Sequence, residues 1–60
     1  MKTYNDFVVA AQTELAKAAC YDREADDCEY GSAAQQYIRE NADDCRTLAK
    51  RYNRLADAKR

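Results

Sequence analysis

One turn signal divides the 60-residue chain, the stretch Glu29-Tyr30-Gly31-Ser32-Ala33-Ala34-Gln35. It holds the only glycine and the only serine of the sequence. Gly31 suits the left-handed residue that closes a helix, and Ser32 suits the N-cap of the next helix. Gln35 follows Ser32 by three positions, so the two side chains also fit a capping box. The stretch therefore predicts one tight turn between two helices.

The residues on either side of this turn favour helix. The chain has twelve alanines, no proline and 35% charged residues, and alanine and the long charged side chains are the strongest helix formers. Thr3 offers an N-cap at the start, with Asp6 in the first turn. We predict an all-α fold and a single domain over 1–60, a two-helix antiparallel hairpin with helices at about 3–30 and 33–58.

An alternative with three helices, at about 3–20, 23–30 and 33–58, stays open. Five acidic residues lie between positions 22 and 29, in the last turns of the first predicted helix, where the helix dipole disfavours negative charge. A break near 21–22 would place these acids in the favourable first turn of a new helix. The hairpin is preferred because neither glycine nor proline occurs near residue 21.

Apolar and small residues recur in both predicted helices with alternating steps of four and three, the spacing of a left-handed helix pair. The first row is Tyr4, Val8, Ala11, Leu15, Ala18, Asp22 and Ala25, and the second is Ala34, Ile38, Asn41, Cys45, Leu48, Tyr52 and Leu55. A turn at 31–32 pairs Val8 with Leu55, Ala11 with Tyr52, Leu15 with Leu48, Ala18 with Cys45 and Ala25 with Ile38. Asp22 then meets Asn41, either as a polar layer that fixes the register or with both side chains in solvent.

An alanine-rich seam between two helices buries little apolar surface for so short a chain. Further apolar residues lie outside the predicted seam, at Phe7, Val9, Tyr21, Tyr30 and Tyr37, with a second line at Ala16, Cys20, Ala49 and Ala56. An exposed apolar line on a small hairpin indicates that another helix packs there. We predict a homodimer that forms a four-helix bundle, or a stable complex with another protein.

Charge is distributed unevenly along the chain, although the net charge is only −1. Residues 22–44 carry eight acids and two arginines, a net −6, whereas residues 45–60 carry six bases and one acid, a net +5. A hairpin would place an acidic pole at the turn and a basic pole at the open end, roughly 40 Å apart at about 1.5 Å per residue. The two poles together suit an antiparallel dimer with the acidic turn of one copy against the basic end of the other, the acidic pole alone suits a basic protein surface, and the basic pole alone suits phosphates.

The sequence offers little for catalysis. It has no histidine, which excludes Cys–His and Ser–His pairs, and its single glycine and single serine exclude a phosphate-cradling loop. Cys20, Cys28 and Cys45 are spaced too widely for a zinc site. We therefore expect no enzyme activity, no cofactor, no metal and no small-molecule substrate.

Cysteine usage and hydropathy bear on location. Three thiols without a C-x-x-C pair suit a reducing cytoplasm, and the alternative is a Cys20–Cys45 disulfide with Cys28 free. The longest apolar run, residues 7–11, is far shorter than the ~20 residues that span a bilayer, and the start of the chain is too polar for a secretory signal. We expect a cytoplasmic protein without membrane contact, in the host cytoplasm if a phage encodes it.

The sequence supports three functional hypotheses. The first is a protein-interaction module, an adaptor or inhibitor of the sort that phages and mobile elements encode, with candidate contacts at Phe7, Val9, Glu24, Asp26, Asp27, Glu29, Tyr30 and Tyr37. The second is a dimeric RNA- or DNA-binding regulator that uses the basic final helix, at Arg46, Lys50, Arg51 and Arg54. The third is a structural subunit that folds only within a larger assembly.

The second hypothesis has an architectural parallel. A helical hairpin with a cysteine on its seam resembles the plasmid copy-number regulators, which dimerise and bind paired RNA hairpins. The likeness involves no shared motif, so it implies no residue roles. The near-neutral charge and the pI of about 5.2 are unfavourable for sequence-independent nucleic-acid binding, so the first hypothesis is preferred.

Overall fold

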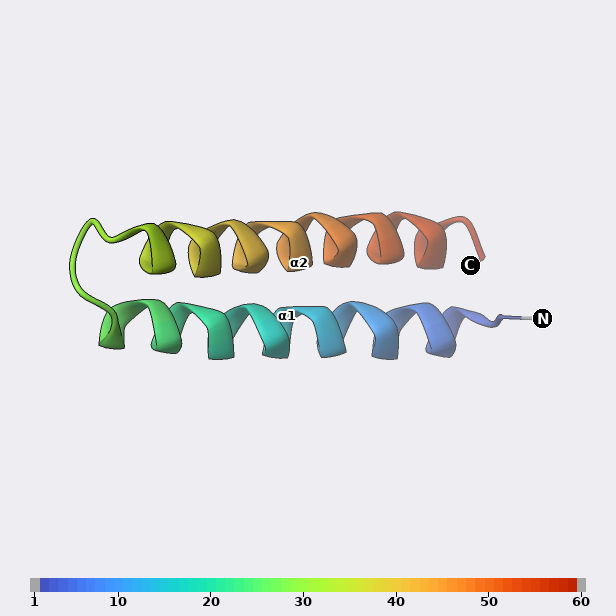
Figure 1. Cartoon of the computed structure of the whole chain (residues 1–60). Coiled ribbons are helices and arrows are strands. Elements are labelled where there is room, and N and C mark those ends of the chain that lie inside the picture. The colour runs from blue at the N-terminus through green and yellow to red at the C-terminus, as the bar shows by residue number, and fades with distance from the viewer. Residues whose placement is uncertain (1, 60) are drawn as a thin grey trace.

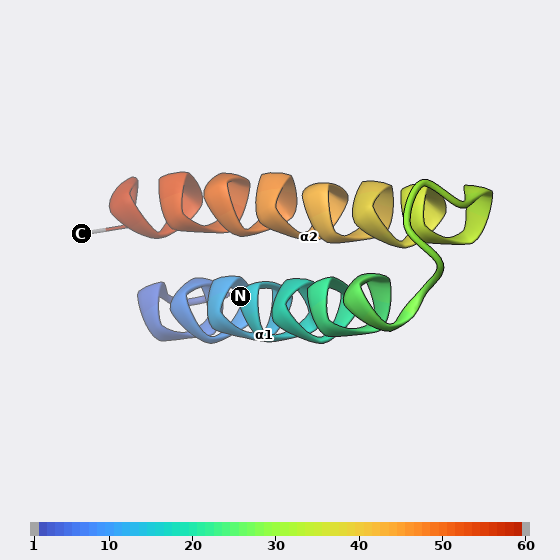
Figure 2. The same cartoon turned by 90° about the vertical axis from the view of Figure 1, so that its left-hand side faces the viewer.

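The computed structural model describes residues 2–59, which form two α-helices joined by one short loop (Figure 1). Helix α1 spans Tyr4–Asp27 and helix α2 spans Ala33–Asp57. They lie side by side and antiparallel, with both ends of the chain opposite the loop (Figures 1 and 2). The molecule measures 44 × 14 × 13 Å, a rod one helix pair across. The predicted all-α hairpin is confirmed.

Helix α1 runs without interruption through residues 21 and 22, so the three-helix alternative is wrong. Two buried alanines, Ala18 and Ala25, lie on either side of the suspected break and pack toward α2. Burial of both alanines on one continuous face outweighs the unfavourable position of the acids relative to the helix dipole. Helix α1 does end three residues before the predicted boundary, which removes Glu29 from the helix.

Both helices begin at the residues that the sequence indicates. The Thr3 hydroxyl accepts a hydrogen bond from the Asp6 N–H (3.4 Å), and the Asp6 carboxylate accepts one from the Thr3 N–H (2.9 Å), which makes a reciprocal capping box. Ser32 caps α2 by accepting from the Gln35 N–H (3.1 Å). The second half of the predicted box at Ser32 is wrong, because the Gln35 side chain accepts from the Gly31 N–H instead (2.8 Å).

The loop between the helices is longer than the predicted two-residue turn. The Cys28 N–H closes the last turn of α1 on the Ala25 carbonyl (3.1 Å). A β-turn follows, in which the Ser32 N–H donates to the Glu29 carbonyl (3.0 Å). Gly31, at the third position of this turn, has φ 75°, the left-handed value that the position requires in a type II turn. The left-handed glycine is confirmed, but it closes a β-turn and not a helix.

Gln35 is the one buried polar residue in the described part of the chain, with 5% of its surface exposed. Its amide oxygen accepts from the Gly31 N–H, and its amide nitrogen donates to the Ala25 carbonyl (2.9 Å). That carbonyl belongs to the last turn of α1 and also accepts the Cys28 N–H. A single side chain of α2 therefore binds both the loop and the end of α1.

Small side chains make up the core of the hairpin. Seven apolar residues are buried in the described part of the chain: Ala11, Ala18, Ala25, Ala42, Cys45, Ala49 and Ala56. The alanines recur every seventh residue, so they form one stripe along each helix, and the two stripes face each other. Within residues 2–59 no large side chain is fully buried. The prediction of a thin, alanine-rich seam is confirmed in composition.

The predicted seam residues Ala11, Ala18, Ala25 and Cys45 are buried, but the rest of the seam is rotated from its predicted position. Leu15 and Leu55, which were predicted to lie inside, are 49% and 42% exposed. In α2 the buried stripe consists of Ala42, Ala49 and Ala56, each one residue beyond the predicted Asn41, Leu48 and Leu55. Ala49 and Ala56, expected on a second line outside the seam, therefore lie within it. A methyl group fills the gap between the two helices, whereas a leucine side chain there would hold them further apart.

The register also differs from the predicted one. The prediction pairs Ala25 with Ile38 and Ala11 with Tyr52, whereas Gln35 bonds to Ala25, and Phe7 stacks on Tyr52. Both pairs are displaced by about one helical turn, because the loop centres on residue 30 and not on 31–32. The predicted neighbourhood of Ala18 and Cys45 is confirmed, since both belong to one buried cluster with Ala42.

Candidate functional site

The turn end of the hairpin brings together the acidic residues that were predicted to bind a protein. Four exposed carboxylates surround the end of α1 and the start of the loop: Glu24, Asp26, Asp27 and Glu29. None of them forms an ion pair within residues 2–59, and the last turn of α1 contains no basic residue. The free carbonyls at the C-terminus of α1 add further negative potential. We call this group the acidic end.

Two exposed tyrosines accompany the acidic end. Tyr30 lies in the loop directly after Glu29 and is 90% exposed. Tyr37 lies in the second turn of α2 and is 66% exposed. An open hollow of about 410 Å³ extends from Tyr30 along the first turns of α2 as far as Asp43. Tyrosines in such positions offer apolar contact area with a polar tip, which suits a protein interface.

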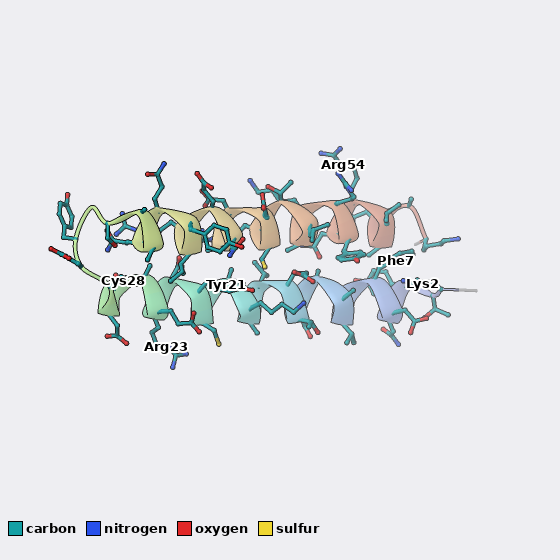
Figure 3. The ribbon with its side chains drawn as sticks, in the orientation of Figure 1. Lys2, Phe7, Tyr21, Arg23, Cys28 and Arg54 are labelled. Atoms are coloured by element: carbon teal, nitrogen blue, oxygen red, sulfur yellow. The ribbon has the colours of Figure 1, made fainter. Side chains whose placement is uncertain are left out.

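The other two residues of the predicted apolar line lie elsewhere. Phe7 is near the open end, half-buried, with its ring 6.4 Å from that of Tyr52 between centroids. Figure 3 shows Phe7 and Tyr21 directed from α1 toward α2. Val9 is 59% exposed, but it lies about 27 Å along α1 from Asp27 at about 1.5 Å per residue. The predicted contacts therefore divide into a cluster at the turn and two separate residues.

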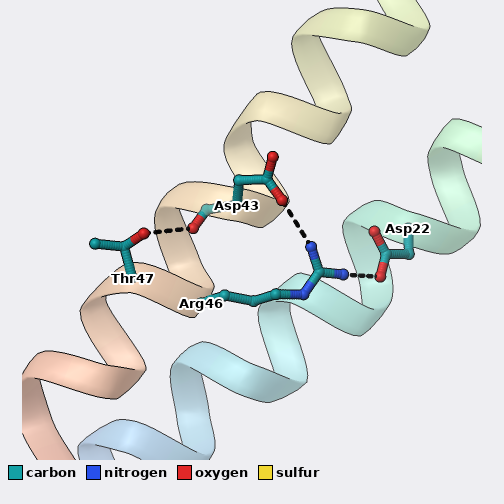
Figure 4. A network of polar contacts seen from close by, with 4 residues as sticks. All are labelled: Asp22, Asp43, Arg46 and Thr47. Carbon is teal, nitrogen blue, oxygen red and sulfur yellow. Dashed lines mark hydrogen bonds and ion pairs between the residues drawn. The ribbon is translucent and has the colours of Figure 1, made fainter.

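Arg46, the first residue of the alternative nucleic-acid set, is engaged within the hairpin (Figure 4). Its guanidinium donates to the Asp43 carboxylate one turn earlier (2.9 Å) and also to the Asp22 carboxylate of α1. The Thr47 hydroxyl donates to the Asp43 carbonyl (3.0 Å). Asp22 thus pairs with Arg46 and not with Asn41, so the predicted polar layer is wrong: a long arginine reaches across the helix pair where asparagine does not.

The remaining basic residues of the set are free of ion pairs within residues 2–59. Lys50, Arg51 and Arg54 are exposed on the half of α2 near the open end, where they border a shallow hollow of about 230 Å³ with Thr47. Figure 3 shows Arg54 directed away from α1. The structure therefore brings three of the four predicted residues together and leaves Arg46 with its charge offset by two carboxylates.

A polar group that the sequence analysis did not assign lies at the middle of the seam. Glu14 is half-buried, and its carboxylate accepts a hydrogen bond from the Lys17 ammonium (3.3 Å). Burial raises the pKa of the Cys45 thiol, and the adjacent Glu14 carboxylate raises it further. The same carboxylate raises the pKa of Lys17 through the hydrogen bond and its charge. Glu14 lies seven residues from both Phe7 and Tyr21, and this heptad spacing could have indicated that Glu14 shares their side of α1.

The three cysteines are free thiols, and they differ in exposure: Cys20 is exposed, Cys28 intermediate and Cys45 buried. The alternative Cys20–Cys45 disulfide is not formed. We expect iodoacetamide to modify Cys20 first and Cys45 last, because Cys45 combines burial with a raised pKa. Timed alkylation followed by peptide mass spectrometry measures this order. Rapid labelling of Cys45 in the folded protein would contradict it.

The raised pKa of Cys45 also sets a pH dependence. The folded state disfavours the Cys45 thiolate. The protonated thiol therefore contributes fully to the free energy of unfolding below the unfolded thiol pKa of about 8.5. This contribution is lost as the pH rises through the higher pKa of the folded state. We expect the midpoint of thermal unfolding to fall above about pH 8.5 and to fall less steeply in Cys45→Ala. Equal slopes in the two proteins would contradict the assignment.

Metal ligation, membrane spans and similarity to known proteins are three separate questions for this chain. The described residues contain no group of three or more His, Cys, Asp or Glu side chains placed to hold a metal ion. Neither α1 nor α2 has the length and hydropathy needed to cross a bilayer. No family model matches the chain, and no curated protein or solved structure is significantly similar to it.

Proposed function

We propose that the chain is a small non-enzymatic protein-interaction module, an adaptor or inhibitor, that docks its acidic end on a basic surface of a partner protein. The observation that carries this proposal is the combination of four unpaired carboxylates with a tyrosine that is 90% exposed at the tip of the loop. Exposed carboxylates steer association with a basic surface, and a buried tyrosine is a frequent source of binding energy at the centre of an interface.

The distribution of ion pairs supports this proposal over nucleic-acid binding. None of the four carboxylates of the acidic end is paired within residues 2–59 of the hairpin, whereas Arg46 is bound to Asp22 and Asp43. Of the four basic residues predicted to contact nucleic acid, three remain free of ion pairs within residues 2–59, and so few phosphate contacts give weak binding. A protein partner with a lysine- or arginine-rich surface therefore fits the hairpin better than a phosphate backbone does.

The proposal is tested by cross-linking from a defined position in the source cells. A photoreactive benzoylphenylalanine in place of Tyr30 is expected to give a discrete protein adduct, because Tyr30 lies within the proposed interface. The same residue in place of Val9, which is 59% exposed near the other end, serves as the matched control. Neutralising the acidic end with E24Q, D26N, D27N and E29Q is expected to reduce the adduct at position 30 by at least about tenfold.

Two outcomes would contradict the proposal. Adducts of equal yield from positions 9 and 30 would show that the partner has no preferred site on the hairpin. An adduct at position 30 that persists after the four carboxylates are neutralised would show that they do not contribute to binding. Nucleic-acid adducts from a probe at Arg51 that disappear in K50Q/R54Q would establish the alternative function instead. Circular dichroism of each variant confirms that the hairpin is still folded.

A further inference from the structure

The two sides of the seam differ in chemical character. On one side Phe7 stacks on Tyr52, and Tyr21 packs against the buried cluster of alanines and Cys45. On the other side Asp22 pairs with Arg46 across the helices. The hairpin is therefore amphipathic across its thickness, with an aromatic and aliphatic side and a polar side.

The apolar side extends along most of the hairpin. Ile38 and Tyr52 lie seven residues from Cys45 on either side, and Leu48 and Leu55 lie one turn after Cys45 and Tyr52, so all four share a side of α2. We define the apolar face as Phe7, Tyr21, Ile38, Leu48, Tyr52 and Leu55. The first five are half-buried within the hairpin, and Leu55 is 42% exposed. Each of these side chains has one layer of helices beneath it and none above.

We propose that two copies of the chain pack antiparallel through their apolar faces and form a four-helix bundle. The face measures at most 44 × 14 Å, which is roughly 600 Å² per copy and about 1,200 Å² for a pair, the lower limit for a stable interface. The two hairpins must therefore overlap along their full length. Partial overlap would leave too little area and would expose the large side chains at one end.

Charge selects the antiparallel arrangement. Full overlap allows either both turns at one end or the turns at opposite ends. The first arrangement brings two acidic ends together, whereas the second places each acidic end at the same end of the bundle as the basic open end of the other copy. Lys50 and Arg54 follow Arg46 at steps of four and so lie on the polar side, which means that they act through net charge and not through contacts within the interface. In the antiparallel dimer, segment 22–44 of each copy, with a net charge of −6, lies at the same end as segment 45–60 of the other copy, with a net charge of +5. The dimer contains two such complementary ends.

The middle of the face fits the same symmetry. The midpoint of α1 falls between Glu14 and Lys17, and the midpoint of α2 falls at Cys45. A two-fold axis through these points places Glu14 opposite Lys17 of the second copy, and Lys17 opposite Glu14. It also sets Tyr52 against Ile38 of the second copy, because both residues lie seven positions from Cys45. Both features are lost when the turns lie at the same end.

Two matched leucines test the interface. Leu55 on the apolar face and Leu15 on the polar side have similar exposure, 42% and 49%, so glutamate is tolerable at either position in a single hairpin. We expect light scattering after gel filtration to give twice the 6.9 kDa chain mass for the wild type and Leu15→Glu at micromolar concentration, and a mass at least partly monomeric for Leu55→Glu. A monomeric wild type, or a Leu55→Glu chain as dimeric as Leu15→Glu, would overturn the proposal.

A distance measurement tests the orientation. Cys28 lies at the turn and becomes the sole cysteine in C20A/C45A, where it can carry a nitroxide spin label. The antiparallel dimer separates the two labels along the rod by about 38 Å at about 1.5 Å per residue, because Cys28 is far from the midpoint of α1. Pulsed electron resonance is expected to show this long distance. A distribution confined to short distances would mean that both turns lie at one end and would overturn the antiparallel arrangement, whatever the result at position 30.

Discussion

Replacing Ala42 by leucine is expected to lower the free energy of unfolding by about 2–3 kcal/mol. Ala42 is fully buried and lies in one cluster with Ala18 and Cys45, where the two helices approach on methyl groups alone. Three additional carbon atoms have no space there, so either the helices separate or the side chain takes a strained rotamer. Urea unfolding followed by circular dichroism, at one fixed protein concentration, measures the loss.

The control for Ala42→Leu is the same substitution at Ala16, which is exposed on α1. Leucine and alanine have similar helix propensities, so Ala16→Leu is expected to change the free energy of unfolding by less than about 0.5 kcal/mol. A leucine at position 42 that left the stability unchanged would contradict the alanine seam. It would instead support the predicted seam, in which residue 41 and not residue 42 faces the partner helix.

Replacing Gln35 by alanine is expected to cost about 2–3 kcal/mol, although the residue is neither apolar nor charged. The substitution removes the hydrogen bonds to the Gly31 N–H and the Ala25 carbonyl at once. It also leaves a cavity at a position that is 5% exposed. Gln36→Ala is the matched control: Gln36 is exposed in the same turn, and its replacement is expected to change the stability by less than about 0.5 kcal/mol.

A glutamate at position 35 separates the two hydrogen bonds. Its carboxylate retains an acceptor for the Gly31 N–H but has no donor for the Ala25 carbonyl, and it adds a buried negative charge close to the acidic end. We expect Gln35→Glu to be at least as destabilising as Gln35→Ala at neutral pH. The loss should diminish on acidification, because protonation restores a donor. Equal stability of Gln35→Glu and the wild type at neutral pH would show that the bond to Ala25 contributes nothing.

The candidate surfaces were only partly evident in the sequence. The acidic end follows from composition, because residues close together in sequence remain close at the end of a hairpin. Helix length alone already separates Phe7 from Tyr30 along the hairpin. The packing of Phe7 on Tyr52 nevertheless had to be seen in the structure before the predicted apolar line divided into separate sites. The pairing of Arg46 with Asp43 three residues earlier could be read from helix spacing, but its pairing with Asp22 could not, since Asp22 belongs to the other helix.

The sequence by itself determined the elements of this protein: two helices, their N-caps at Thr3 and Ser32, and a left-handed Gly31 between them. These features depend on contacts within about four residues, which local sequence specifies. Tertiary structure alone decided which side of each helix is buried and which residues meet. A spacing of four and three residues fits two adjacent rows of side chains on α2 equally well as the buried row. Hydrophobicity favoured the row that contains leucine, but the close approach of the two helices buries the row that contains alanine.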